Sequence, residues 1–141
     1  MAGKTDKNQV KDCPCGGGLF AKCCGRFISG AAIPDSAEQL MRSRYTAFSL
    51  RDEAYLKSTW ASETLPDDAV SGEDDVKWIG LNIVKHKHLR DSDLATVEFI
   101  ARFKVGGRAH RLHEVSNFER REDEQGNKRW YYVDGSFPDD E

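Results

Sequence analysis

A regular alternation of apolar and polar residues constrains the fold of this chain more than any other feature. In residues 93–105 the apolar side chains fall at odd positions: Val97, Phe99, Ala101, Phe103 and Val105. Because successive side chains of a strand point to opposite faces, this pattern predicts a strand with one buried face. Three further strands are predicted, separated by turn residues, over 76–88, 108–121 and 128–134. Four consecutive strands joined by short turns predict an antiparallel meander.

The residues before these strands have helical patterns instead. A helix is predicted over 36–50, and either Ser36 with Gln39 or Asp35 with Glu38 offers its capping box. A second helix is predicted to begin near Asp52 and to include Tyr55, Leu56 and Trp60, and an acidic loop over 61–75 leads into the first strand. Helices followed by an antiparallel meander predict an α+β domain, in which the helices cover one face of the sheet.

The composition narrows the class of protein. With 141 residues, 38% hydrophobic and 32% charged, the chain suits one globular domain with its own core. A net charge of −3 argues against a dedicated nucleic-acid binder, which would usually be basic. No apolar run approaches the roughly 18 residues of a membrane span, and the polar start predicts no signal peptide. We therefore expect a cytoplasmic protein with no membrane association.

All four cysteines lie in one short stretch, "CPCGGGLFAKCCG" at residues 13–25. Cytoplasmic thiols stay reduced, so a cluster indicates metal binding or redox chemistry more than disulfides. Adjacent cysteines rarely bridge one another without strain, and the C-x-x-C pair of a thioredoxin-like centre is absent. Four thiolates complete a tetrahedral shell, which is typical of structural zinc, whereas catalytic zinc keeps one position open. The predicted ligands of one zinc ion are Cys13, Cys15, Cys23 and Cys24.

The same stretch resembles the SEC-C motif, the zinc-binding knuckle at the end of the SecA translocation ATPase. The usual form reads C-x-C-G-S-G, and here Gly17 replaces the serine without touching a ligand. The resemblance implies that the four cysteines hold zinc.

Five further stretches extend the likeness: "LMRSRYTAF" (40–48), "YLKSTW" (55–60), "WIGLNIV" (78–84), "LHEVSNFER" (112–120) and "WYYVDG" (130–135). Together with the cysteines they resemble the YchJ-like family of bacterial proteins, which is essentially uncharacterised. That family joins the knuckle to a cone-shaped domain similar to nuclear transport factor 2. The implied organisation is a disordered N-terminus (1–12), a knuckle (13–25), a linker (26–35), a nuclear-transport-factor-2-like domain (36–135) and an acidic tail (136–141).

Two charged residues fall where apolar ones are expected. Arg44 lies in the middle of the apolar stripe of the predicted helix, and Glu114 shares a strand face with two large hydrophobic residues. Arginine is rarely buried without a partner. We therefore expect a buried pair between Arg44 and Glu114, with Tyr45 and Ser116 hydrogen-bonding nearby.

The same residues also allow a functional interpretation. In isomerases with the cone fold, a carboxylate abstracts a proton while a donor holds the oxyanion, roles that would fall to Glu114 and Tyr45. Trp60 and Trp78 either pack the core or line the mouth of such a pocket. A tight pair with Arg44 would lower the basicity of Glu114, which favours a structural pair over a ligand site, and a ligand site over a catalytic one.

The leading expectation is a zinc-stabilised interaction protein that is not an enzyme. SEC-C knuckles elsewhere dock protein partners, and cone domains often dimerise through the sheet, so the resemblance implies both kinds of contact. The alternative is a small-molecule binder, or an isomerase-like or hydrolase-like enzyme, that uses the cone pocket. Nucleic-acid contact through Lys11, Lys22 and Arg26 is a third option, which the acidic total opposes.

Overall fold

The computed structural model describes residues 11–70 and 75–140, and its centre is one antiparallel sheet. Each strand pairs with the next along the chain, in the order β1-β2-β3-β4. The strands are β1 (Val76–His88), β2 (Leu94–Val105), β3 (Arg108–Glu122) and β4 (Lys128–Ser136). The predicted meander is therefore confirmed, and so is the α+β fold class.

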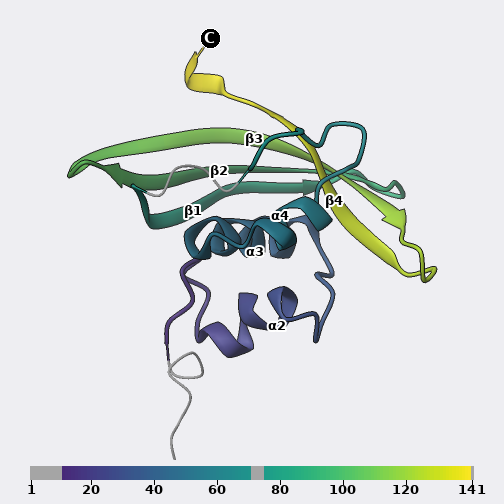
Figure 1. Ribbon diagram of the computed structural model, residues 1–141. Helices are drawn as coiled ribbons and strands as arrows, with labels where there is room; N and C mark the ends of the chain where they lie inside the picture. The colour runs from purple at the N-terminus through teal and green to yellow at the C-terminus, as the bar shows by residue number, and fades with distance from the viewer. Residues whose placement is uncertain (1–10, 71–74, 141) are drawn as a thin grey trace, which may run out of the picture.

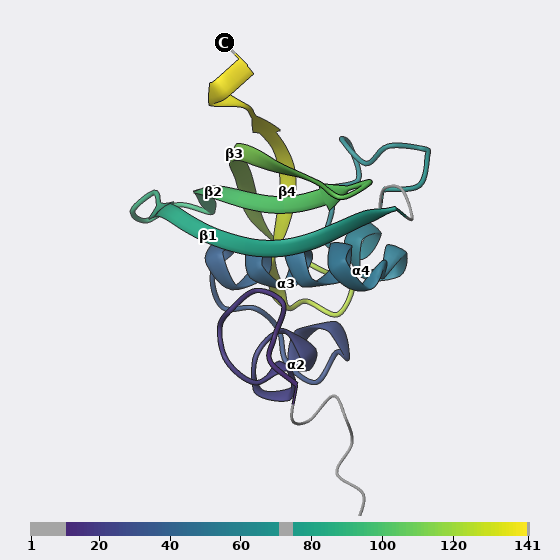
Figure 2. The same cartoon turned by 90° about the vertical axis from the view of Figure 1, so that its left-hand side faces the viewer.

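Two helices cover one face of this sheet, as Figures 1 and 2 show. They are α3 (Ala37–Leu50) and α4 (Glu53–Ser58). Ser36 caps α3 by accepting a hydrogen bond from a backbone N–H of the first turn at 3.2 Å. Asp52 caps α4 in the same way at 3.0 Å. None of the helices in the described part of the chain is long and apolar enough to cross a bilayer.

The core lies between α3 and the inner face of the sheet. Val97, Phe99 and Ala101 of β2 are buried there with Leu40 and Met41 of α3, as the alternation predicts. Register shifts interrupt β1 at two places and the β3–β4 pair at one. Such bulges bend strands and increase their twist, and the sheet curves over the helices accordingly (Figure 1).

A small cysteine knuckle, residues 11–28, lies on the side of α3 away from the sheet (Figures 1 and 2). It contains a single 3-10 turn, η1 (Phe20–Lys22), and the short helix α2 (Cys24–Ile28). Because α2 continues past residue 25 and buries Phe27, the first residues of the predicted linker belong to this unit. Asp12, assigned to the N-terminal tail, also belongs to it through a bridge with Leu19. The remainder of the predicted disordered segment, residues 1–10, lies outside the described residues.

The acidic tail is partly held against the sheet. Pro138–Asp140 form a 3-10 turn, η2. The Asp139 carboxylate lies 3.1 Å from Nδ1 of His113 and 3.3 Å from Nη2 of Arg111, both on β3. Sequence alone does not predict these contacts, because they join residues 26 and 28 positions apart.

Candidate metal centre and cone pocket

The four cysteine side chains meet at one point. Their Sγ atoms all lie within 4.8 Å of one another, and the cysteines are free thiols rather than disulfides. The Cys15–Cys23 and Cys23–Cys24 sulfur pairs are 3.5 and 4.0 Å apart. A tetrahedral ion with metal–sulfur bonds of about 2.3 Å separates its sulfurs by about 3.8 Å. The cluster therefore has the dimensions to hold a metal ion.

Glycines shape the turn between the first and second cysteine pairs. Gly16 and Gly18 have φ angles of 84° and 125°, values that side-chain-bearing residues rarely adopt. Gly17 lies against two of the sulfurs, since an added Cβ would come 2.9 Å from Cys23 Sγ and 3.2 Å from Cys15 Sγ. The glycine that departs from the usual motif therefore gives these thiols room to approach.

The electrostatics of the cluster favour a cation at its centre. Burial, together with the neighbouring thiol of Cys15, raises the pKa of Cys23 to about 12. Hydrogen bonding with Cys13 and Cys15 raises the pKa of Cys24. Thiolates packed this closely repel one another, and the positive charge of a coordinated metal ion offsets that repulsion and keeps the ligands deprotonated.

The metal centre is joined to the domain core. Cys13 Sγ lies 3.5 Å from the hydroxyl of Thr46, and Arg42 donates to the carbonyl of Cys15 at 3.1 Å, both from α3. Cys13, Cys15 and Cys24 belong to the same buried cluster as the apolar residues of α3 and the sheet. The knuckle is thus docked on the domain.

On the other side of α3, a cavity of about 240 Å³ lies between the helix and the inner face of the sheet. We call it the cone pocket. It brings together the residues that the sequence analysis grouped: Arg44, Tyr45, Trp60, Trp78, Glu114 and Ser116. A larger surface hollow of about 500 Å³, beside the β3–β4 turn, contains none of the buried polar side chains.

Glu114 is 8% exposed and is held by two donors. Its Oε2 accepts hydrogen bonds from the hydroxyls of Ser116 at 2.8 Å and Tyr132 at 2.9 Å. Gly135 of β4 lies directly against it, because an added Cβ there would come 2.8 Å from the Glu114 carboxyl carbon. Sequence reasoning missed Tyr132 and Gly135, although a glycine inside a strand is a recognised sign of close approach.

Arg44 is 2% exposed and does not pair with Glu114. Its Nη1 donates to the Leu56 carbonyl at 2.9 Å and to the Thr59 hydroxyl at 2.6 Å, at the end of α4. Among the described residues no ion pair within 4.0 Å joins it to Glu114, so the prediction of a direct pair is wrong. The reason is Tyr132, whose hydroxyl binds Glu114 while its ring centre lies 4.7 Å from the Arg44 guanidinium.

Aromatic rings form much of the rest of the pocket wall. Trp78 packs edge-on against Tyr45 with ring centres 5.7 Å apart, and its buried indole N–H has no acceptor among the described residues. The Trp60 ring centre lies 5.1 Å from the guanidinium carbon of Arg44 and 4.9 Å from the ring centre of Tyr132. Burial lowers the pKa of Arg44 to about 10.

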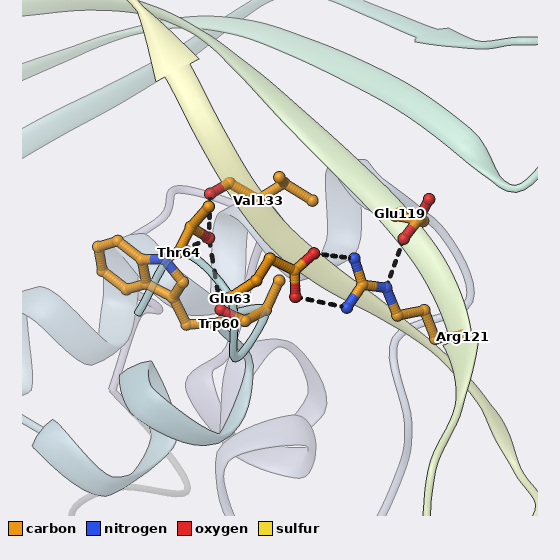
Figure 3. A network of polar contacts seen from close by, with 7 residues as sticks. Trp60, Glu63, Thr64, Glu119, Arg121 and Val133 are labelled. Atoms are coloured by element: carbon orange, nitrogen blue, oxygen red, sulfur yellow. Dashed lines mark hydrogen bonds and ion pairs between the residues drawn. The ribbon is translucent and has the colours of Figure 1, made fainter. Parts of the chain in front are cut away.

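The loop that carries Trp60 is fastened to the sheet (Figure 3). The Trp60 indole donates to the Thr64 hydroxyl at 3.2 Å, and Thr64 donates to the Val133 carbonyl at 2.6 Å. Beside them, Glu63 receives two hydrogen bonds from Arg121 of β3, one of them at 2.9 Å. The position of Trp60 at the pocket is therefore fixed by contacts to β3 and β4.

Together, the curved sheet, its covering helices and the docked cysteine knuckle define an NTF2-like domain with a SEC-C-type knuckle. Residues 36–135 match the family model "YchJ, middle NTF2-like domain". The chain belongs to the YchJ-like family.

Relatives and solved structures agree with this assignment. A UPF0225 protein of Ralstonia nicotianae is 53% identical over 131 residues, which cover 87% of this chain and 89% of the relative. The crystal structure of a SEC-C motif containing protein from Psychrobacter arcticus matches with a TM-score of 0.78 at 28% identity, covering 90% of this chain and 82% of that one. The solution structure of a SEC-C motif containing protein from Rhodopseudomonas palustris matches with a TM-score of 0.76 at 34% identity. The match covers 90% of this chain and 98% of that one.

Proposed function

We propose that this protein is a non-catalytic interaction protein of the cytoplasm whose knuckle holds one structural zinc ion. The observation that carries the proposal is the cluster of four sulfurs within 4.8 Å, most of it buried in the core that α3 shares with the sheet. Four thiolates in a tetrahedron suit zinc and leave no open position for substrate. The ion would fix the shape of the knuckle and so the surface that the knuckle presents.

An exposed apolar surface on the knuckle supports a protein partner. Leu19 is 40% exposed beside η1, and Leu50 at the end of α3 is 51% exposed. A hollow of about 310 Å³ lies next to Leu50, with Phe20 and Pro14 in its walls. Exposed apolar side chains around a hollow are typical of contact sites.

Two other associations are supported less strongly. A homodimer through the sheet would use the edge strand β1, where Ile79 and Val84 are 45% and 48% exposed. Nucleic-acid contact would need free basic side chains on the knuckle. Arg26 is instead engaged there, donating to the Cys23 carbonyl at 3.2 Å and lying 4.4 Å from the Phe27 ring centre.

The knuckle proposal is tested by affinity capture from the native cell with the full chain and its Leu19→Asp variant. A charge introduced into an apolar contact costs about 2 kcal/mol or more, so we expect at least about tenfold less captured partner at unchanged zinc content. Lys22→Gln, an exposed change on η1, is the matched control and should capture normally. Capture that is unchanged both in Leu19→Asp and in the Cys23→Ser, Cys24→Ser double variant would rule out docking through the knuckle.

A second candidate function is ligand binding in the cone pocket, favoured by its volume of about 240 Å³ and its buried Arg44. Glu114 Oε2 already accepts hydrogen bonds from two protein hydroxyls, those of Ser116 and Tyr132, so this oxygen is not free to act on a substrate. Binding without catalysis therefore fits the pocket better than an isomerase-like or hydrolase-like reaction.

A further inference from the structure

Arg44 is a buried cation with unused donors. Its side chain is 2% exposed, and its only hydrogen bonds to described residues are made by Nη1, to two neutral oxygens. Nε and Nη2 have no hydrogen-bond partner in the described chain. A buried charge is costly unless an opposite charge or enough hydrogen bonds compensate it. The guanidinium is therefore set up to receive an anion.

The space beside this cation is the cone pocket. Its volume of about 240 Å³ corresponds to about eight liquid-water volumes, which suits a small metabolite rather than a cofactor. Apart from Arg44, most of the wall is aromatic or aliphatic, with Trp78, Phe99 and Leu112 contributed by three different strands. A ligand that fits must have a compact apolar body and one charged end.

We infer that the cone pocket binds a small monocarboxylic acid whose carboxylate is held by Arg44. This inference rests on the second candidate function and adds the chemical class of the ligand. Nε and Nη2 lie on one edge of the guanidinium, the arrangement that receives the two oxygens of a carboxylate. The rings of Trp60 and Tyr132, at 5.1 and 4.7 Å, restrict the guanidinium plane before the ligand arrives.

Glu114 disfavours the binding of ligands with more than one negative charge. Its carboxylate lines the same cavity, and it is buried, so its charge is poorly screened. A phosphate with two negative charges would be repelled by it more strongly than a carboxylate with one.

Benzoate is a suitable probe because it joins one carboxylate to a flat apolar ring, and benzamide is its neutral counterpart. The full chain is titrated with each, and backbone amide NMR shifts report where binding occurs. We expect benzoate to shift the amides around Arg44, Trp78 and Glu114, and benzamide to bind at least about tenfold more weakly because it lacks the charge-assisted bonds. Phenyl phosphate should also bind more weakly than benzoate.

Three variants complete the test. Arg44→Met keeps the apolar part of the side chain and should weaken benzoate binding at least about tenfold. Arg102→Met, at an exposed position of β2, is the control and should bind normally. If Arg44→Met fails to fold, Ala101→Leu, which fills the pocket and leaves Arg44 in place, should abolish the benzoate shifts.

The possible failures have different meanings. Equal pocket binding of benzoate and benzamide would overturn the carboxylate inference but leave a ligand pocket. No shifts in the pocket at millimolar benzoate would overturn both. Neither result bears on zinc or on the knuckle's partner.

Discussion

Cys24→Ser should remove the metal and lower the free energy of unfolding by about 4 kcal/mol or more. Cys24 is 1% exposed and lies in the core cluster that joins the knuckle to α3. A structural zinc ion contributes its binding free energy to folding, and a serine hydroxyl does not replace a thiolate ligand. Domains of this size have a free energy of unfolding of only about 5–15 kcal/mol, so this one substitution removes a large part of it.

Urea denaturation followed by circular dichroism, with metal analysis of the same samples, measures both effects. Because the knuckle and the domain share one core, we expect the urea unfolding transition of the whole domain to shift to lower urea concentration. Local unfolding of the knuckle alone is not expected. Lys22→Gln provides the comparison, since it alters an exposed side chain of the same 3-10 turn. A Cys24→Ser protein with normal stability and a full complement of zinc would contradict the four-cysteine site.

Gly135→Ala should destabilise the protein by about 2 kcal/mol, in the range found for overpacked cores. The added Cβ would come 2.8 Å from the carboxyl carbon of Glu114, whose side chain is held in place by Ser116 and Tyr132. Either Glu114 or β4 must move, and both hydrogen bonds then weaken. The effect should be visible in urea denaturation midpoints at neutral pH.

A double-mutant cycle shows whether this cost comes from Glu114. In the Glu114→Ala background the obstruction is gone, so Gly135→Ala should cost at least about 1 kcal/mol less than in the wild type. Gly80→Ala in β1 is the matched control, because an added Cβ there meets no atom within 4 Å, and alanine in a strand is no worse than glycine. Equal effects of the alanine substitutions at Gly80 and Gly135 would show that Glu114 is not packed as described.

The secondary structure could be predicted because its signals are local. The alternation in β2, the glycine pair before β3 and the Ser36 cap of α3 each act over a few residues, and each appears in the structure. The clustering of the four cysteines could be predicted for the same reason. Their spacing is short, and three glycines lie between the pairs.

The contacts that shape the sites are long-range and could not be predicted. Cys13 meets Thr46 across 33 positions, which is why docking of the knuckle was not visible in the sequence. Burial of Arg44 and Glu114 follows from their places in two periodic patterns, but periodicity does not give the partner. The partner common to both is Tyr132, which contacts each of them and replaces the direct ion pair.

X-ray absorption spectroscopy at the zinc edge, on the full chain purified without chelator, tests the zinc-knuckle proposal most directly. The account predicts about one zinc ion per chain, with four sulfur ligands at about 2.3 Å and no nitrogen or oxygen in the first shell. A well-folded protein with almost no metal, or zinc bound partly through nitrogen or oxygen, would contradict it.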